Sequence, residues 1–145
     1  MTIRRAARTD LDALVELAIE FRSVGGEGSD RATIVDGFGG LLGDDTHGVV
    51  WVAIDADELV GYAVVTWGWS IEIGGLDVVL DEIFTRRRGT GVGSALIEHL
   101  ERDCRDRGVK RIFLETELVN DRARRLYERH GYVADTSIWM AKELR

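Results

Sequence analysis

A glycine-rich segment, Arg88-Gly89-Thr90-Gly91-Val92-Gly93-Ser94, lies between an apolar run that ends at Phe84 and a helical pattern that starts near Val92. A strand, a glycine turn and a helix N-terminus in this order leave several backbone N–H groups unpaired and directed at one point. The positive end of the helix dipole lies behind these groups, and Arg88 adds a cation beside them. The segment therefore predicts a site for a bulky anion such as a phosphate or diphosphate.

The spacing of these glycines disfavours the two common nucleotide-binding motifs. A GxGxxG motif requires glycine at position 94 or 96, where Ser94 and Leu96 stand, and the Gly-Lys-Ser/Thr of a P-loop is absent. A dinucleotide-binding oxidoreductase is therefore a distant alternative. The pattern that remains is Arg-x-x-Gly-x-Gly, which is formed by Arg88, Gly91 and Gly93.

A second segment, Asn120–Tyr132, reads NDRARRLYERHGY. On a helix, Asn120, Ala123 and Tyr127 share one face, and Gly131 is typical of the residue that follows a helix end. The two segments together resemble the motifs of the GCN5-related N-acetyltransferase (GNAT) family, Arg-x-x-Gly-x-Gly and Asn-x-x-Ala-x-x-Leu-Tyr-x-x-x-Gly-Phe/Tyr. The resemblance spans essentially all 145 residues and is weakest over residues 22–48.

This resemblance implies that the chain moves acetyl from acetyl-CoA (coenzyme A) to a primary amine by direct attack in a ternary complex. It implies that the diphosphate binds the backbone amides of residues 88–94, and that the end of the preceding strand pairs with the pantetheine arm as a further strand would. Asn120 would hydrogen-bond the cofactor or the neighbouring strands. The expected cofactor-binding residues are Phe84, Thr85, Arg88, Gly89, Thr90, Gly91, Val92, Gly93, Ser94 and Asn120.

The resemblance also suggests the residues that move protons. Tyr127 is expected to be the general acid, because a phenol with a pKa of about 10 can protonate a departing thiolate. The general base is expected to be a carboxylate, and the family pattern favours Glu82 over Asp81. Neighbouring residues on a strand face opposite ways, so only one of these two is expected to face the amine directly. The carboxylates that remain as alternatives are Glu72, Glu115 and Glu117.

Two further features bear on the ligands. The loop Thr85-Arg86-Arg87-Arg88 is two residues shorter than in many family members, and its arginines form either a clamp for the 3′-phosphate or a solvated turn. Trp67 and Trp69 share a strand face near Glu72, so they are either sheet-face residues or part of an amine pocket.

Hydrophobic periodicity predicts the elements that must position these residues. The expected order is a strand at 2–6, a helix capped by Thr9, a helix capped by Ser29 or Asp30, strands at Val49–Asp55, Leu59–Trp69 and Leu76–Thr85, a helix at Gly89–Arg107, a strand at Lys110–Glu117, a helix at Asp121–His130 and one or two closing strands within 132–144. This order predicts an α+β fold with a mixed, mostly antiparallel central sheet and helices on both faces, similar to the acyl-CoA N-acyltransferase fold. A chain of 145 residues predicts one domain, 1–145.

The composition limits the partners. With 26 acidic and 19 basic residues the net charge is −7, which disfavours nucleic acid and suits a cationic amine. No apolar run approaches the roughly 20 residues of a membrane span, and the N-terminus lacks a signal-peptide core, so we expect no membrane partner and a cytoplasmic protein.

The remaining candidates are structural. The only cysteine, Cys104, follows Leu96 and Leu100 on one helix stripe and is expected to be a core thiol. The three histidines lack metal-ligand spacing, so no metal site is predicted. The family resemblance implies a homodimer. The alternatives that remain open are a protein or peptide amine as the acceptor and a non-catalytic regulator that binds acyl-CoA.

Overall fold

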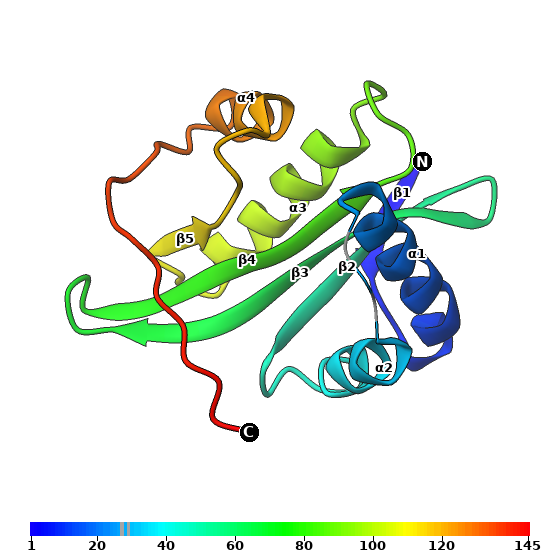
Figure 1. Cartoon of the computed structure of the whole chain (residues 1–145), viewed down its shortest axis with the longest axis horizontal. Coiled ribbons are helices and arrows are strands. Elements are labelled where there is room, and N and C mark those ends of the chain that lie inside the picture. Colours follow the sequence, from blue (N-terminus) through cyan, green and yellow to red (C-terminus); the bar gives the residue numbers. More distant parts are fainter. Residues whose placement is uncertain (27, 29) are drawn as a thin grey trace. The chain divides into compact units, whose positions relative to one another are not determined.

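The computed structural model describes residues 1–26, 28 and 30–145. These residues form two compact units, residues 1–115 and residues 116–145. The first unit is built on a five-stranded sheet in the order β1-β2-β3-β4-β5, in which neighbours up to β4 run antiparallel and β5 runs parallel to β4 (Figure 1). The strands are β1 (Thr2–Arg5), β2 (Gly48–Asp55), β3 (Glu58–Ser70), β4 (Gly75–Thr85) and β5 (Arg111–Leu114). The mixed, mostly antiparallel sheet expected from the sequence is confirmed.

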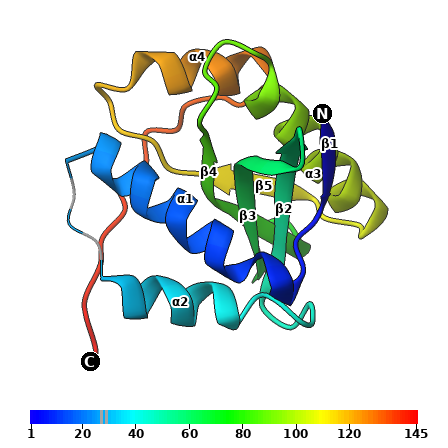
Figure 2. The same cartoon turned by 90° about the vertical axis from the view of Figure 1, so that its right-hand side faces the viewer.

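Helices cover both faces of this sheet, as Figure 2 shows. One face carries α1 (Leu11–Val24) and α2 (Arg31–Gly39), whose apolar side chains pack against alternate residues of β2, β3 and β4 in a single buried cluster. The other face carries α3 (Val92–Asp106), where the ring of His99 lies 4.6 Å from that of Trp51 in β2. The predicted α+β architecture with helices on both faces is therefore confirmed.

The N-cap of the first α-helix differs from the prediction, whereas the N-cap of the second agrees with it. A short 3-10 helix, η1 (Arg8–Asp10), precedes α1, so that Asp10 rather than Thr9 is the N-cap of α1. The Asp10 carboxylate does not cap the helix by its side chain, because it binds Arg4 at 2.8 and 3.0 Å and accepts the Ala7 N–H at 2.7 Å. The predicted Asp30 cap is confirmed for α2, where this side chain accepts the N–H of Ala32; Ser29 lies outside the described residues.

The third helix is shorter at its start than predicted. Gly91 is its N-cap and has a φ of +83°, which is not helical, so α3 begins at Val92 rather than at Gly89. Cys104 lies on the buried face of α3 and is 3% exposed, which confirms the predicted core thiol. Burial raises the pKa of this thiol to about 11. The strand predicted over Lys110–Glu117 forms only as β5.

The second unit holds one helix, α4 (Asp121–Arg129), which is one residue shorter than the predicted Asp121–His130. His130 is its C-cap, and Gly131 follows with a φ of +88°, as expected for the residue after a helix end. No residue between 116 and 145 is fully buried. The closing strands expected within 132–144 are absent, and apolar side chains there, such as Ile138 and Met140, are exposed. A strand needs a neighbour for its N–H and C=O groups, and this unit by itself provides none. Among the described residues, no helix is long and apolar enough to cross a membrane.

Candidate active site

The paired length of β4 differs on its two sides. Toward β3 the strand is paired along its whole length, from Gly75 to Thr85. Toward β5 it is paired only over Asp77–Leu80, because β5 ends at Leu114. Within the described first unit, residues 81–85 therefore have no strand partner on the β5 side. An extended ligand could pair with this free edge as an added strand would, which is the role that the family resemblance implies for Phe84 and Thr85.

The loop that follows β4 is held by threonine hydroxyls. The Thr85 hydroxyl accepts the Arg87 N–H at 3.2 Å, and the Thr90 hydroxyl donates to the Arg87 carbonyl at 2.7 Å. The loop leads into α3 through Gly91, which has no side chain to cap the helix and faces space in which an added Cβ would meet no atom within 4 Å. A helix N-terminus of this kind, open to solvent, suits an anion.

The three loop arginines have different partners, which decides between a clamp and a solvated turn. The Arg86 guanidinium binds the Glu20 carboxylate of α1 at 2.9 Å, and the Arg87 guanidinium is ion-paired with Asp55 at the end of β2. In the part of the chain that the structure describes, Arg88 has no carboxylate partner. Arg88 alone is therefore available for a ligand anion.

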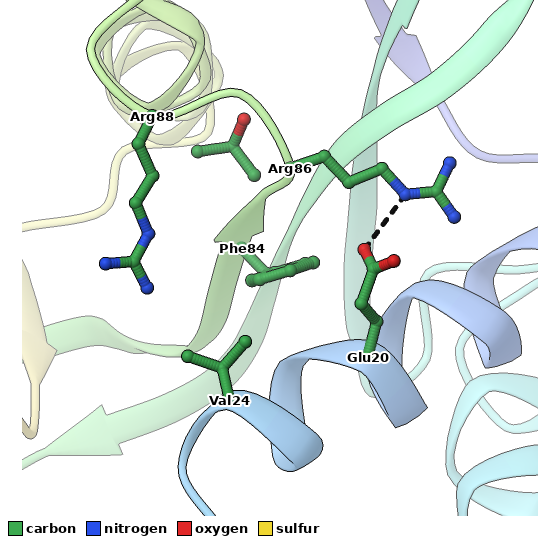
Figure 3. A pocket seen from close by; sticks show the side chains of 6 residues that line it. Glu20, Val24, Phe84, Arg86 and Arg88 are labelled. Atoms are coloured by element: carbon green, nitrogen blue, oxygen red, sulfur yellow. Dashed lines mark hydrogen bonds and ion pairs between the residues drawn. The ribbon is translucent and has the colours of Figure 1, made fainter.

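A cavity of about 370 Å³ opens between the end of β4 and the last turns of α1. Figure 3 shows Arg86 and Arg88 on opposite sides of Phe84, with Arg86 turned toward Glu20. The Phe84 ring is 9% exposed and stacks on Phe21 with ring centroids 5.3 Å apart, so it fixes the end of β4 against α1. The lining residues are Glu20, Val24, Phe84, Thr85, Arg86 and Arg88.

The residue predicted as the base, Glu82, lies in a half-buried polar cluster on the α1 face of β4. Its carboxylate accepts bonds from the Arg22 guanidinium of α1 at 2.5 and 3.3 Å, and from the Tyr62 hydroxyl of β3 at 2.7 Å. Burial, followed by the negative charge of Glu82, raises the pKa of Tyr62 well above its usual value, so this phenol stays protonated and donates. Burial acts to lower the pKa of Arg22, but the bonds and charge of Glu82 outweigh it and raise that pKa.

Asp81 is the extra residue of a β-bulge. Leu80 pairs with Val65 and Glu82 with Val64, so Asp81 has no opposite residue in β3. The prediction that only one of the two adjacent carboxylates faces the amine depends on regular alternation, and the bulge interrupts that alternation. Partial burial, followed by the charge of Glu82, raises the pKa of Asp81, and the charge of Arg22 opposes the rise. Both carboxylates therefore lie within electrostatic reach of Arg22.

The second unit carries the other two predicted residues. The Asn120 side-chain oxygen accepts the N–H of Ala123 at 3.2 Å, so Asn120 caps α4. The half-buried Tyr127 ring contacts that of Tyr132, with centroids 6.1 Å apart. Burial raises the pKa of Tyr127, which keeps its phenol protonated near neutral pH.

The remaining candidates have structural partners of their own or are open to solvent. The Trp67 indole N–H donates to the Asp45 carbonyl at 2.7 Å, and the Arg107 guanidinium lies 4.8 Å from its ring centroid. Trp67 is thus a sheet-face residue with its own partners, whereas Trp69 is 75% exposed. Glu72 lies 3.9 Å from Arg111, and Glu115 and Glu117 are exposed residues that follow β5.

Sequence reasoning missed Arg22 and Tyr62. Arg22 lies next to Phe21 near the end of an amphipathic helix, and Tyr62 occupies one of the alternate apolar positions of a strand. A polar group at the tip of an otherwise buried residue is the signal that points to a buried acceptor. Nothing in the local pattern identifies that acceptor, because Glu82 is 60 residues from Arg22 along the chain.

Known proteins resemble this chain both in sequence and in structure. Residues 11–132 match the acetyltransferase (GNAT) family. Streptothricin acetyltransferase of Streptomyces lavendulae is 33% identical over 99 residues, which are 67% of this chain and 51% of that protein, so the match spans about half the length of this relative.

Solved structures resemble the whole chain. An integron cassette protein from the mobile metagenome of Cole Harbour Salt Marsh has a TM-score of 0.88 at 31% identity, with coverage of 99% of this chain and 90% of that one. An aminoglycoside N-acetyltransferase solved in complex with CoA has a TM-score of 0.83, with coverage of 99% and 95%. Its identity of 17% makes this second likeness one of fold alone.

Proposed function

Because this chain belongs to the acetyltransferase (GNAT) family, we propose that it transfers acetyl from acetyl-CoA to the primary amine of a small cationic molecule, by direct attack in a ternary complex. The family uses acetyl-CoA, and relatives by sequence or fold include a streptothricin acetyltransferase and an aminoglycoside N-acetyltransferase bound to CoA. The net charge of −7 favours a cationic acceptor. A homodimer and a cytoplasmic location remain predictions.

The observation that carries this proposal is the unpaired Arg88 beside the open N-terminus of α3. The neighbouring arginines are neutralised by carboxylates, whereas this one is left beside backbone that suits an anion. Arg88 and the backbone of residues 89–94 would hold the diphosphate. The free edge of β4 at Phe84 and Thr85 would pair with the pantetheine arm, and Asn120, whose amide NH₂ is not used by its cap bond, would bind the cofactor.

Two proton transfers accompany the reaction. When bound, acetyl-CoA supplies the thioester and the thiolate leaving group. Tyr127 would protonate the sulfur, which its raised pKa permits because the phenol still carries its proton at neutral pH. A carboxylate of β4, Glu82 or Asp81, would take a proton from the substrate ammonium.

Calorimetric titration with acetyl-CoA, with NADP as the control ligand, tests the cofactor. We expect saturable one-to-one binding of acetyl-CoA alone, and no binding would overturn the proposal. Release of free thiol is then measured with aminoglycosides, polyamines, a streptothricin and a lysine-containing peptide. Turnover with the peptide alone would indicate a protein acceptor, and binding without any turnover would indicate a regulator.

The role of Tyr127 has its own test. Tyr127→Phe removes the proton donor but keeps the ring that contacts Tyr132, so we expect at least a tenfold loss in kcat with acetyl-CoA affinity nearly unchanged. An unchanged kcat would remove Tyr127 from this role.

A further inference from the structure

The adjacent carboxylates of Asp81 and Glu82 differ in how many bonds they already make. Each carboxylate can accept about four hydrogen bonds. Glu82 accepts from two guanidinium nitrogens of Arg22 and from the hydroxyl of Tyr62, and these occupy both of its oxygens. In contrast, the described residues place no hydrogen bond or ion pair on the side chain of Asp81.

Proton transfer to Glu82 would disturb the whole cluster. Arg22 and Glu82 have side chains that are only 25% and 21% exposed, so a neutral Glu82 would leave a largely buried guanidinium without its counter-ion. Removing one partner of such a pair is costly because the remaining charge is poorly solvated. Tyr62 is fully buried, and the hydrogen bond that its hydroxyl donates to Glu82 would also have to rearrange. Glu82 therefore suits a fixed role in positioning its neighbours.

Asp81 lies at the point in β4 where pairing with β5 has just ended. Pairing with β5 ends at Leu80, so Asp81 is the first residue of β4 whose β5 side lacks a strand partner in the described unit. It is also the bulge residue, which is exposed and is not held by the β3 register. A carboxylate at this point is accessible from the free edge along which the pantetheine arm is proposed to lie.

We propose that Asp81 is the residue that accepts the proton of the substrate ammonium, and that Glu82, Arg22 and Tyr62 form a fixed group that positions it. This inference rests on the proposed acetyltransferase function and names the base within it. Partial burial and the negative charge of Glu82 raise the pKa of Asp81 above its usual value, which is the direction that makes a carboxylate a stronger base. The groups that act on Asp81 are Glu82 in β4 and Arg22 in α1, with Tyr62 of β3 bound to Glu82.

The proton transfer balances as follows. An N–H bond of the ammonium breaks, its electron pair stays on nitrogen, and an O–H bond forms on the Asp81 carboxylate. The neutral amine forms the new C–N bond as the C–S bond breaks, and the sulfur receives a proton from Tyr127. The acylated nitrogen then loses its second proton, which restores the Tyr127 phenol. The ammonium and acetyl-CoA thus give the amide, free CoA thiol and one proton, which Asp81 returns to solvent.

The experiment compares Asp81→Asn with Glu82→Gln, a matched pair that keeps size and removes charge. Acetyl-CoA affinity is measured first by calorimetry, and kcat and KM are then measured with the best amine across pH. For Asp81→Asn we expect kcat to fall at least about 100-fold, with acetyl-CoA affinity unchanged and the acidic limb of the kcat/KM profile lost. Asp81→Glu should recover part of kcat, because it restores a carboxylate.

Glu82→Gln should retain the acidic limb and lose less of kcat than Asp81→Asn. Equal or greater loss of kcat in Glu82→Gln, with the limb abolished and the fold intact, would overturn the assignment to Asp81. So would unchanged kinetics in Asp81→Asn while the unsubstituted enzyme turns over. Lack of turnover in the unsubstituted protein is a different result, because it overturns the proposed function and this assignment with it.

Discussion

The unequal pairing of the loop arginines predicts that Arg88→Ala and Arg87→Ala will have opposite consequences. Arg88 has no carboxylate partner among the described residues, so its loss should leave folding unchanged and remove a cation from the proposed anion site. Arg87 is ion-paired with Asp55, so its loss should act on folding and leave the ligand site unchanged. The two variants remove the same side chain one residue apart.

The magnitudes follow from exposure. A bond to a charged group contributes about 1.5 kcal/mol at the lower end of its range, which suits an exposed guanidinium and corresponds to about a tenfold weaker Kd for acetyl-CoA in Arg88→Ala. The side chains of Arg87 and Asp55 are 45% and 36% exposed, so water screens their ion pair. Arg87→Ala should therefore lower the free energy of unfolding by less than about 1 kcal/mol.

Calorimetric titration gives the Kd and urea unfolding gives the stability, both at two salt concentrations. The affinity difference between the unsubstituted protein and Arg88→Ala should shrink at high salt, because ions screen an exposed charge. Two results would contradict this expectation: Arg87→Ala weakens acetyl-CoA binding as much as Arg88→Ala does, or neither variant changes the Kd. Either result would show that the absence of a carboxylate partner does not identify the anion-binding arginine, and the reasoning would fail.

Two predictions concern the fold. A Cβ on Gly61 would lie 2.8 Å from the carbonyl oxygen of Phe84, whereas one on Gly37 in α2 would meet no atom within 4 Å. In urea unfolding, Gly61→Ala should therefore lower the free energy of unfolding by about 2 kcal/mol, and Gly37→Ala should raise it by about 1 kcal/mol. Changes of the same sign in both variants would contradict the packing argument. Because burial raises the pKa of Cys104 to about 11, the unfolded thiol ionises before the folded one, and stability should fall above pH 9 by up to about 1.4 kcal/mol per pH unit. Cys104→Ser, which does not ionise there, should show a shallower fall, and parallel curves would refute the assignment.

The sheet and its helices could be predicted because each element has a clear hydrophobic period. The pattern of Val49–Asp55 and its neighbours gave strands within one residue of β2, β3 and β4. The cap of α1 could not be predicted, because Asp10 is held by Arg4 across a turn. The expected strands within 132–144 failed for a related reason, since a strand exists only where another strand accepts its hydrogen bonds.

The positions of the residues proposed to bind an anion were easier to predict than the carboxylate cluster. The proposed anion site is local in sequence, because glycine spacing and Arg88 define it, and the structure places these residues in the loop before α3 and in its first turn. The cluster depends on the register of β3 against β4 and on a contact between α1 and β4, neither of which is encoded locally. Sequence reasoning therefore proposed Glu82 without its partners, and it could not anticipate the bulge that distinguishes Asp81.

The bulge also makes β4 tolerant of a change in length at one point inside the sheet. Deleting a residue from a paired strand normally turns every later side chain to the opposite face. Deleting Asp81 would instead join Leu80 directly to Glu82, and these two already face consecutive residues of β3, Val65 and Val64. Phe84 would stay in the core and Arg22 would keep its counter-ion. A deletion library should therefore recover folded protein at position 81, so the chain can gain or lose this carboxylate without rebuilding the fold around it.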